Sequence, residues 1–248
     1  MSEIAAPNVR TPDVHRWTGI AAITVAALMV TEFTVRMSMG DRPDLDQPEA
    51  LAEFIQRTAT QALIVIMIDT FLMASMIVLL AGFRQIITQV RRDLQWVADL
   101  GFGAGLVFVT VTLIGDALNG GAALDTVGME PDPTAIRALT EGYTLMFGAT
   151  GCVLIALICG AGGYVTLVSG ALPRWTGWVA VVVAVTSVLV VPTMFNGTST
   201  ADPFSAGGDV VTVLATFPFF AWSVAVGIVT IRGRRPHERV AQREVQRS

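Results

Sequence analysis

The 248-residue sequence contains no lysine, and all 16 of its basic residues are arginines. Only 15% of its residues are charged, whereas a soluble domain carries about a quarter. A net charge of −4 provides no basic surface, so no nucleic-acid partner is expected. Two cysteines cannot form a disulfide framework. His15 and His237 have no other metal ligands at suitable spacing, and no phosphate loop, dinucleotide fingerprint or nucleophile elbow occurs in a credible context. The sequence therefore predicts neither a metal site nor a cofactor.

Long apolar stretches dominate the chain, in which 53% of the residues are hydrophobic. A transmembrane helix needs about 20 mostly apolar residues. Six segments meet this length: Trp17–Arg36, Thr60–Ala81, Leu100–Leu118, Tyr143–Val168, Trp175–Thr193 and Val210–Ile231. The first is too long for the apolar part of a signal peptide, so we expect it to be retained as a span. The predicted fold is an all-α integral membrane bundle of six transmembrane helices.

Arginine is distributed unevenly between the predicted connections. Twelve arginines fall in the N-terminal segment, the second and fourth connections and the C-terminal tail: Arg10, Arg16, Arg84, Arg91, Arg92, Arg174, Arg232, Arg234, Arg235, Arg239, Arg243 and Arg247. The other side has four, Arg36, Arg42, Arg57 and Arg137. Because cytoplasmic connections are rich in arginine, we expect both termini in the cytoplasm. This divides the chain into a cytoplasmic segment (1–16), a six-helix transmembrane domain (17–231) and a basic cytoplasmic tail (232–248).

Acidic residues have the opposite distribution. Eleven fall on the predicted outer side: Asp41, Asp44, Asp46, Glu49, Glu53, Asp125, Glu130, Asp132, Glu141, Asp202 and Asp209. Four tryptophans lie at the predicted inner boundary, as in an aromatic belt: Trp17, Trp96, Trp175 and Trp178. On the outer side, Asp46 is expected to cap a short surface helix that begins at Pro48, and Asp132 to cap another that begins at Pro133.

Asp69 is the most unusual residue in the predicted spans. Counting from the outer end of the second span places it near the membrane midplane, where ionisable groups are costly. The sequence shows no arginine, lysine or histidine at a similar depth to neutralise it. Three interpretations stay open. Asp69 is a protonated acid that joins neighbouring helices by a hydrogen bond, or a ligand or proton site, or the second span is misplaced and Asp69 does not lie at this depth.

Two further polar groups lie toward the predicted outer side. Glu32 and Arg36 have the i, i+4 spacing of an ion pair, which either sits at the membrane interface or lines an outward-facing pocket. Thr112, Asp116 and Asn119 share one helix face near the predicted end of the third span.

The polar face of Thr112, Asp116 and Asn119 has two explanations: solvation at the end of the helix, or a role as the polar wall of a pocket. Gly120 and Gly121 are expected to end that helix. Asn196 and Asp209 are expected at a comparable depth, which together predicts an outer polar vestibule with Asp69 at its floor. Asp69, Glu32 and Asp116 are the candidate catalytic residues if the protein is an enzyme.

Two sets of residues are expected to shape the helices. Gly148, Cys152, Ala156 and Gly160 recur every four residues and form a small-residue stripe that suits close helix packing. Pro192 and Pro218 are expected to kink the fifth and sixth spans.

The segment Leu172-Pro173-Arg174-Trp175-Thr176-Gly177-Trp178 resembles the L-P-R-W-x-G-W step before the penultimate span of small, uncharacterised actinobacterial membrane proteins. The resemblance implies a multi-pass fold in a bacterial plasma membrane and transfers no catalytic residue. Physically, the segment suits a helix start at the inner interface, where proline opens the helix and the two tryptophans anchor it.

The leading hypothesis is a membrane protein with an outward-facing polar pocket for a lipophilic or cationic small molecule. One alternative is a membrane-embedded, acid-catalysed cyclase or isomerase for a lipophilic terpenoid- or polyketide-like substrate. The spans are poor in the aromatic residues that would shield a carbocation, which weighs against that alternative. Another alternative is a proton-coupled transporter with Asp69 as carrier. Six spans are few for a monomeric transporter, so this alternative requires a homo-oligomer, a dimer.

Overall fold

The computed structural model describes residues 13–127, 131–199 and 201–232, and these residues form helices and connections without a strand. The α-helices are α1 (Val14–Met39), α2 (Pro48–Val90), α3 (Gln95–Asp125), α4 (Pro133–Leu145), α5 (Gly151–Ser169), α6 (Arg174–Val190) and α7 (Phe217–Arg232). Shorter helical turns are η1 (Arg92–Leu94), η2 (Met146–Thr150), η3 (Val191–Phe195) and η4 (Thr212–Thr216). Six helical segments are long and apolar enough to span a membrane, which confirms the predicted all-α fold with six candidate spans.

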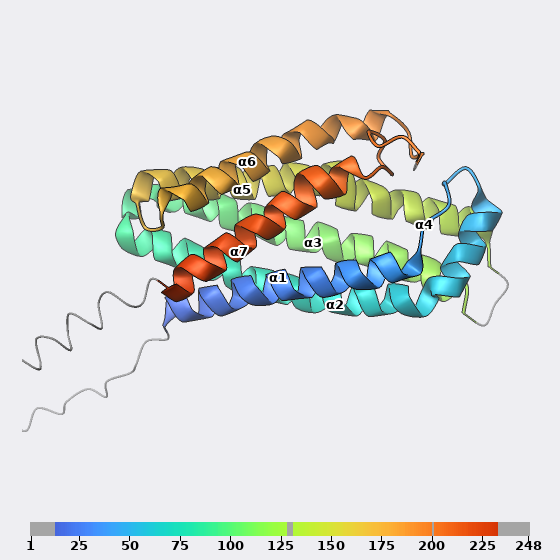
Figure 1. Cartoon of the computed structure of the whole chain (residues 1–248), viewed down its shortest axis with the longest axis horizontal. Coiled ribbons are helices and arrows are strands. Elements are labelled where there is room, and N and C mark those ends of the chain that lie inside the picture. The colour runs from blue at the N-terminus through green and yellow to red at the C-terminus, as the bar shows by residue number, and fades with distance from the viewer. Residues whose placement is uncertain (1–12, 128–130, 200, 233–248) are drawn as a thin grey trace, which may run out of the picture.

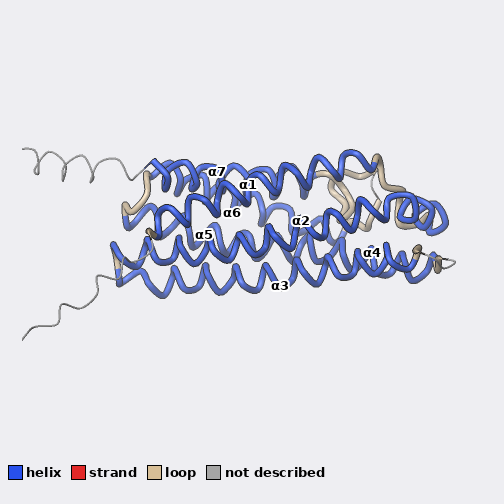
Figure 2. Tube along the Cα trace, turned by 90° about the horizontal axis from the view of Figure 1, so that it is seen from below, coloured by secondary structure: helices blue, strands red, loops and turns tan. Residues whose placement is uncertain are grey.

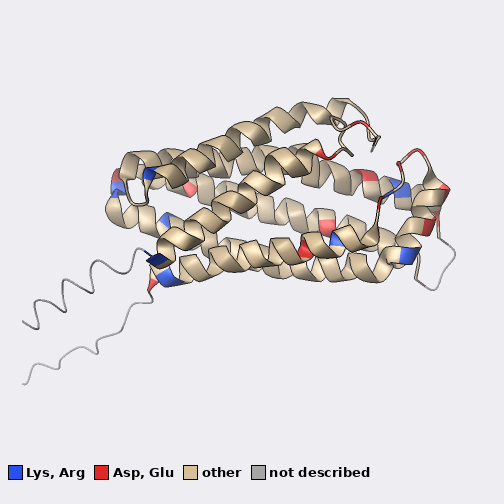
Figure 3. Cartoon of the chain, viewed as in Figure 1, with Lys and Arg blue, Asp and Glu red and all other residues tan. Residues whose placement is uncertain are grey.

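The helices lie side by side in an elongated bundle (Figures 1 and 2), and many of the charged residues lie at its two ends (Figure 3). One end, here called the basic end, holds the start of α1 and the end of α7. Its arginines are Arg16, Arg84, Arg91, Arg92, Arg174 and Arg232 (Figure 3). The other, the acidic end, holds α4 and most of the carboxylates. Described acidic residues there are Asp41, Asp44, Asp46, Glu49, Glu53, Asp125, Asp132, Glu141, Asp202 and Asp209.

α2 is one continuous helix of 43 residues, so the predicted separate surface helix before the second span is wrong. The helix does begin at Pro48, but its N-cap is Gln47, without a side-chain hydrogen bond, rather than Asp46. The apolar residues of its first part pack against α3 and α4 in a cluster of their own: Leu45, Leu51, Ala52, Phe54, Ile55, Ala59, Ala62, Ala122, Ala123 and Ile136. At about 1.5 Å per residue, α2 is about twice as long as the roughly 30 Å hydrocarbon core.

α3 also runs further than the sequence indicated. It continues through Gly120 and Gly121 and ends at Asp125. A methyl group on Gly120 would lie 3.1 Å from Cδ1 of Ile66, which shows that this glycine lets α2 and α3 approach each other. Its expected role as a helix cap is therefore wrong. The predicted start of α4 is confirmed, because the Asp132 carboxylate accepts hydrogen bonds from two backbone amides of its first turn.

Three helices depart from α geometry toward the acidic end. In η2, a π-helical turn between α4 and α5, Gly148 has non-helical dihedral angles (φ −75°, ψ −115°). Pro192 lies in the 3₁₀ turn η3 that follows α6, and Pro218 follows the π-helical turn η4. Proline cannot donate the regular backbone hydrogen bond, which explains the last two breaks. The predicted distortions at Pro192 and Pro218 are thus confirmed.

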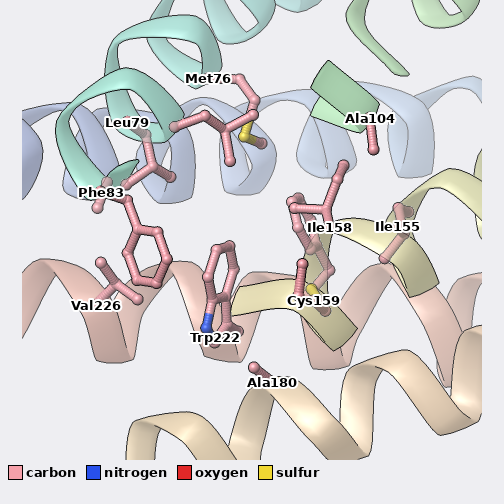
Figure 4. Close-up of a cluster of buried hydrophobic side chains, with 14 of the residues drawn as sticks. Met76, Leu79, Phe83, Ala104, Ile155, Ile158, Cys159, Ala180, Trp222 and Val226 are labelled. Atoms are coloured by element: carbon pink, nitrogen blue, oxygen red, sulfur yellow. The ribbon is translucent and has the colours of Figure 1, made fainter. Parts of the chain in front are cut away.

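The main hydrophobic core lies between α1, α2, α3, α5, α6 and α7. Trp222 of α7 is 2% exposed, and its ring meets Phe83 of α2 edge-to-face with a centroid distance of 6.0 Å. Figure 4 shows Trp222 between Phe83 on one side and Ile158 and Cys159 of α5 on the other. This contact joins α2, α5 and α7 on the basic side of the helix breaks.

The predicted small-residue stripe is not where α5 makes its closest contact. A methyl group on Gly148 would have no atom within 4 Å, and one on Gly160 would lie 3.9 Å from Ala184 Cβ. On Gly163, by contrast, it would lie 3.0 Å from the backbone oxygen of Gly177. Because a backbone atom of α6 cannot move aside easily, Gly163 is the glycine that α5 and α6 require.

We expect Gly163→Ala to lower the free energy of unfolding by about 1–3 kcal/mol, because the added methyl group forces α5 and α6 apart. Gly160→Ala is the matched control on the same helix. It should be neutral or stabilising by up to about 1 kcal/mol, since alanine favours helix more than glycine does. Thermal melting of both variants in detergent tests this, and equal melting temperatures would contradict the assigned contact.

Candidate functional site

The contact between α1 and α2 places their charged residues at one level. A methyl group on Gly82 would overlap the hydroxyl group of Thr18, so the two antiparallel helices touch at this point. Along antiparallel helices, residue numbers at the same level have a nearly constant sum. Glu32 of α1 therefore lies level with Asp69 of α2.

Arg36 connects three helices at this level. Its Nε atom donates to Oε1 of Glu32 at 2.5 Å, and its Nη1 atom donates to the hydroxyl oxygen of Tyr143 in α4 at 2.7 Å. Its Nη2 atom lies 3.6 Å from Oδ2 of Asp69. The expectation that no cation lies near Asp69 is wrong, because helical side chains point back toward the helix N-terminus and an arginine reaches more than one turn. The predicted pairing of Glu32 with Arg36 is confirmed.

Two carboxyl groups lie deeper than this ion pair. Asp69 and Asp116 are each 2% exposed. Oδ2 of Asp69 and both carboxyl oxygens of Asp116 are buried without a hydrogen-bond partner among the described residues. Asp69 interacts electrostatically with both Glu32 and Asp116. Solvation at a helix end is therefore not the explanation for Asp116, which lies inside the bundle.

A cavity of about 240 Å³ lies beside these residues. Its polar wall contains Glu32, Arg36, Asp69, Thr112 and Tyr143. The rest of its lining is mainly apolar: Met29, Phe33, Leu72, Met73, Met76, Phe108, Phe147, Ile155, Val211, Thr212, Thr216 and Phe219. Two of the helix breaks, η2 and η4, contribute to it directly. The cavity is thus amphipathic, with charge on one wall and thioether and aromatic groups on the others.

Five aromatic side chains line this cavity: Phe33, Phe108, Tyr143, Phe147 and Phe219. None of them was predicted as a site residue, and the expectation that the spans are poor in aromatic residues is wrong at this site. Their spacing contained a signal. Tyr143 and Phe147 are four residues apart, and Phe108 precedes Thr112 by four, so each pair shares a helix face.

Four predicted site residues lie outside the cavity lining: Asp116, which is buried behind it, and Asn119, Asn196 and Asp209. Asn196 and Asp209 are exposed in the connection between η3 and η4, where the Asn196 amide donates to the backbone oxygen of Phe204. Asn119 of α3 is half-buried and lies one turn beyond Asp116. The predicted outer vestibule is therefore wrong in its upper part. The candidates that the structure brings together are Glu32, Arg36, Asp69, Thr112 and Asp116.

The sequence matches no protein-family model, no curated protein and no solved structure at a significant level. Within the described residues, no three histidine, cysteine or acidic side chains are placed to hold a metal ion. What the site offers chemically is a set of hydrogen-bond acceptors, one fixed guanidinium group and an apolar chamber. Such a site can bind an amphipathic molecule and can hold or release protons.

Removing the charge of Glu32 should destabilise the bundle. We expect Glu32→Gln to lower the free energy of unfolding by about 1–3 kcal/mol, because Arg36 loses a charged partner in a half-buried place. Glu141→Gln is the matched control, since Arg137 and Glu141 form an i, i+4 pair at 2.9 Å with side chains 47% and 40% exposed. That exposed pair should contribute less than about 1 kcal/mol. Thermal melting in detergent measures both, and a larger loss at Glu141 would refute this ranking.

Proposed function

We propose that this protein resides in a bacterial plasma membrane and binds a lipophilic, cationic small molecule in the cavity between α1, α2, α3 and α7. The observation that carries the proposal is the pairing of an apolar, aromatic chamber with three clustered carboxyl groups, Glu32, Asp69 and Asp116. Arg36 is the cation that the described residues place among them. The cluster therefore has an excess of acidic groups that favours a cationic ligand.

The proposed orientation has the basic end in the cytoplasm and the acidic end outside. Two observations support it. Arginine is concentrated at the basic end, and the four tryptophans of the expected inner belt are each at least 49% exposed on the bundle surface: Trp17, Trp96, Trp175 and Trp178. From Gly82, which contacts Thr18, α2 rises about 20 Å to Asp69. The cavity then lies in the outer half of the membrane, and the extensions of α2 and α3 with α4 project outside.

The size and lining of the cavity restrict the ligand. At about 240 Å³ it exceeds the roughly 150 Å³ chamber that holds benzene and falls just short of the roughly 300 Å³ at which drug-sized pockets begin. An aryl group with a short cationic substituent fits this range. Phenyl rings such as Phe33 and Phe219 attract a desolvated cation through their faces.

The aromatic lining also favours a second candidate, a membrane-embedded acid-catalysed cyclase or isomerase. In such an enzyme a buried carboxylic acid such as Asp69 would protonate a lipophilic substrate, and the aromatic rings would stabilise the resulting carbocation. The two candidates differ in what the cavity recognises. A binding site for a cation holds a charged ligand at rest, whereas the enzyme binds a neutral hydrocarbon skeleton.

The orientation is testable by labelling single cysteines in intact cells. Gln47 and Gln95 are both exposed, at the acidic and basic ends respectively, and the native Cys152 and Cys159 are buried. A membrane-impermeant maleimide should label Gln47→Cys from outside and label Gln95→Cys only after the cells are permeabilised. Labelling of Gln95→Cys in intact cells would reverse the proposed orientation.

Ligand class is testable with benzyltrimethylammonium and its neutral isostere neopentylbenzene. The purified protein should bind the cation at least about tenfold more tightly, a difference of about 1.4 kcal/mol, because Asp69 and Glu32 face it. Asp69→Asn should remove this preference, whereas Asp209→Asn, an exposed carboxylate outside the cavity, should retain it. Isothermal titration calorimetry measures the affinities. Equal affinity for both probes would contradict a cation site, and preference for the neutral probe would favour the enzyme.

A further inference from the structure

Asp116 presents a hydrogen-bond problem that the binding function leaves open. An ionised carboxylate accepts hydrogen bonds but cannot donate one. Neither carboxyl oxygen of Asp116 has a partner among the described residues, and Oδ2 of Asp69 has none either. Burying such acceptors without partners costs several kcal/mol, so the site needs a donor.

The neighbouring side chains do not supply one. α1 contributes Glu32 and Arg36, but the guanidinium group of Arg36 is held by Glu32 and Tyr143 and reaches Asp69 only at 3.6 Å. The hydroxyl group of Tyr143 in α4 accepts from Arg36, and no hydroxyl group of Tyr143, Thr112, Thr212 or Thr216 donates to the partnerless carboxyl oxygens of Asp116 and Asp69. The residues by which α5, η2, η4 and α7 line the cavity are not ionisable. Asp69 is the remaining polar neighbour of Asp116, and the two carboxyl groups interact with each other.

We propose that Asp69 and Asp116 share one proton while the cavity is empty, and that a cation binding beside Asp69 displaces it. The inference rests on the proposed function. A single proton converts one carboxylate into an O–H donor and supplies the missing hydrogen bond between the two side chains. When the ligand arrives, its positive charge compensates the negative charge of the second carboxylate electrostatically, and the shared proton leaves. One positive charge enters as one leaves, so the charge of the buried cluster is unchanged.

Glu32 gives the proton a route out of the bundle. Its side chain is 18% exposed, whereas that of Asp69 is 3% exposed, and the two carboxyl groups interact directly. Asp116, Asp69 and Glu32 therefore form a series from the interior of the bundle to accessible surface. Exchange of a cation for a proton is the elementary step of a proton-coupled transporter. By linkage, binding should tighten by up to about tenfold per pH unit as the pH rises, over the range in which the pair holds its proton.

Calorimetry of the full chain with benzyltrimethylammonium tests this exchange. The probe carries no titratable proton, so a proton that is released on binding does not come from the probe and is assigned to the protein. Titrations in phosphate and in Tris, which differ in protonation enthalpy, give the number of protons released. We expect about one proton per bound cation for the wild type and for Glu141→Gln. Asp116→Asn should bind the probe with no proton release, because its amide donates permanently to Asp69 in place of the shared proton.

Infrared difference spectroscopy gives an independent readout. The empty wild type should show the carbonyl band of a protonated carboxyl group, which should vanish on probe binding and be absent from Asp116→Asn. Probe binding without proton release and without loss of this band would overturn the exchange and leave the cation site intact. If Asp116→Asn released as many protons as the wild type, the assignment of the proton to this pair would be overturned. Failure of the wild type to bind the probe at all would overturn the proposed function and the exchange together.

Discussion

Charged side chains inside an apolar bundle need partners, and Arg36 has one on its own helix and two on other helices. The contact between Thr18 and Gly82 sets how α1 lies along α2, and therefore brings Glu32 level with Asp69. Arg36 of α1 then contacts the carboxyl groups of Glu32 and Asp69 and the hydroxyl group of Tyr143, which belongs to α4. A shift of α1 by one turn would keep the Glu32–Arg36 pair but separate Arg36 from Asp69 and Tyr143, which leaves a buried carboxyl group without its nearby cation. The packing of two helices at one end thus determines the electrostatics some 20 Å away.

The cavity exists because the helices around it are irregular. Regular α-helices with apolar faces pack closely, as they do around Trp222 toward the basic end. Toward the acidic end, η2 and η4 widen two helices by a π-helical turn, and both turns contribute side chains to the cavity. π-Helical turns occur frequently at functional sites, because they redirect side chains at a cost in regular hydrogen bonding. Gly148 and Pro218 supply the local sequence reason for each.

Much of the fold follows from local sequence signals. Apolar length identified the six helical segments that could span a membrane, and the proline after an N-cap identified where α4 begins. The continuity of α2 could not be predicted from the sequence, because it depends on the packing of the first part of the helix against α3 and α4. Asp69 was recognisable as a site from its depth alone. Its proximity to Arg36 was not, because it depends on the alignment of two helices and on the reach of a long side chain. Asn196 and Asp209 were assigned by depth too, but depth does not say which way a residue faces.

Arg36 and the proposed shared proton each compensate one negative charge of the acidic cluster. Arg36 is fixed by hydrogen bonds to Glu32 and Tyr143, so its positive charge stays in place whatever the cavity contains. It compensates one of three carboxyl groups permanently and leaves Asp69 at the longer distance of 3.6 Å. A closer contact would satisfy Asp69 and remove its need for any other cation. Under the proposed function, the long distance between Arg36 and Asp69 is therefore the feature that would let the cluster be stable without a ligand and still bind one.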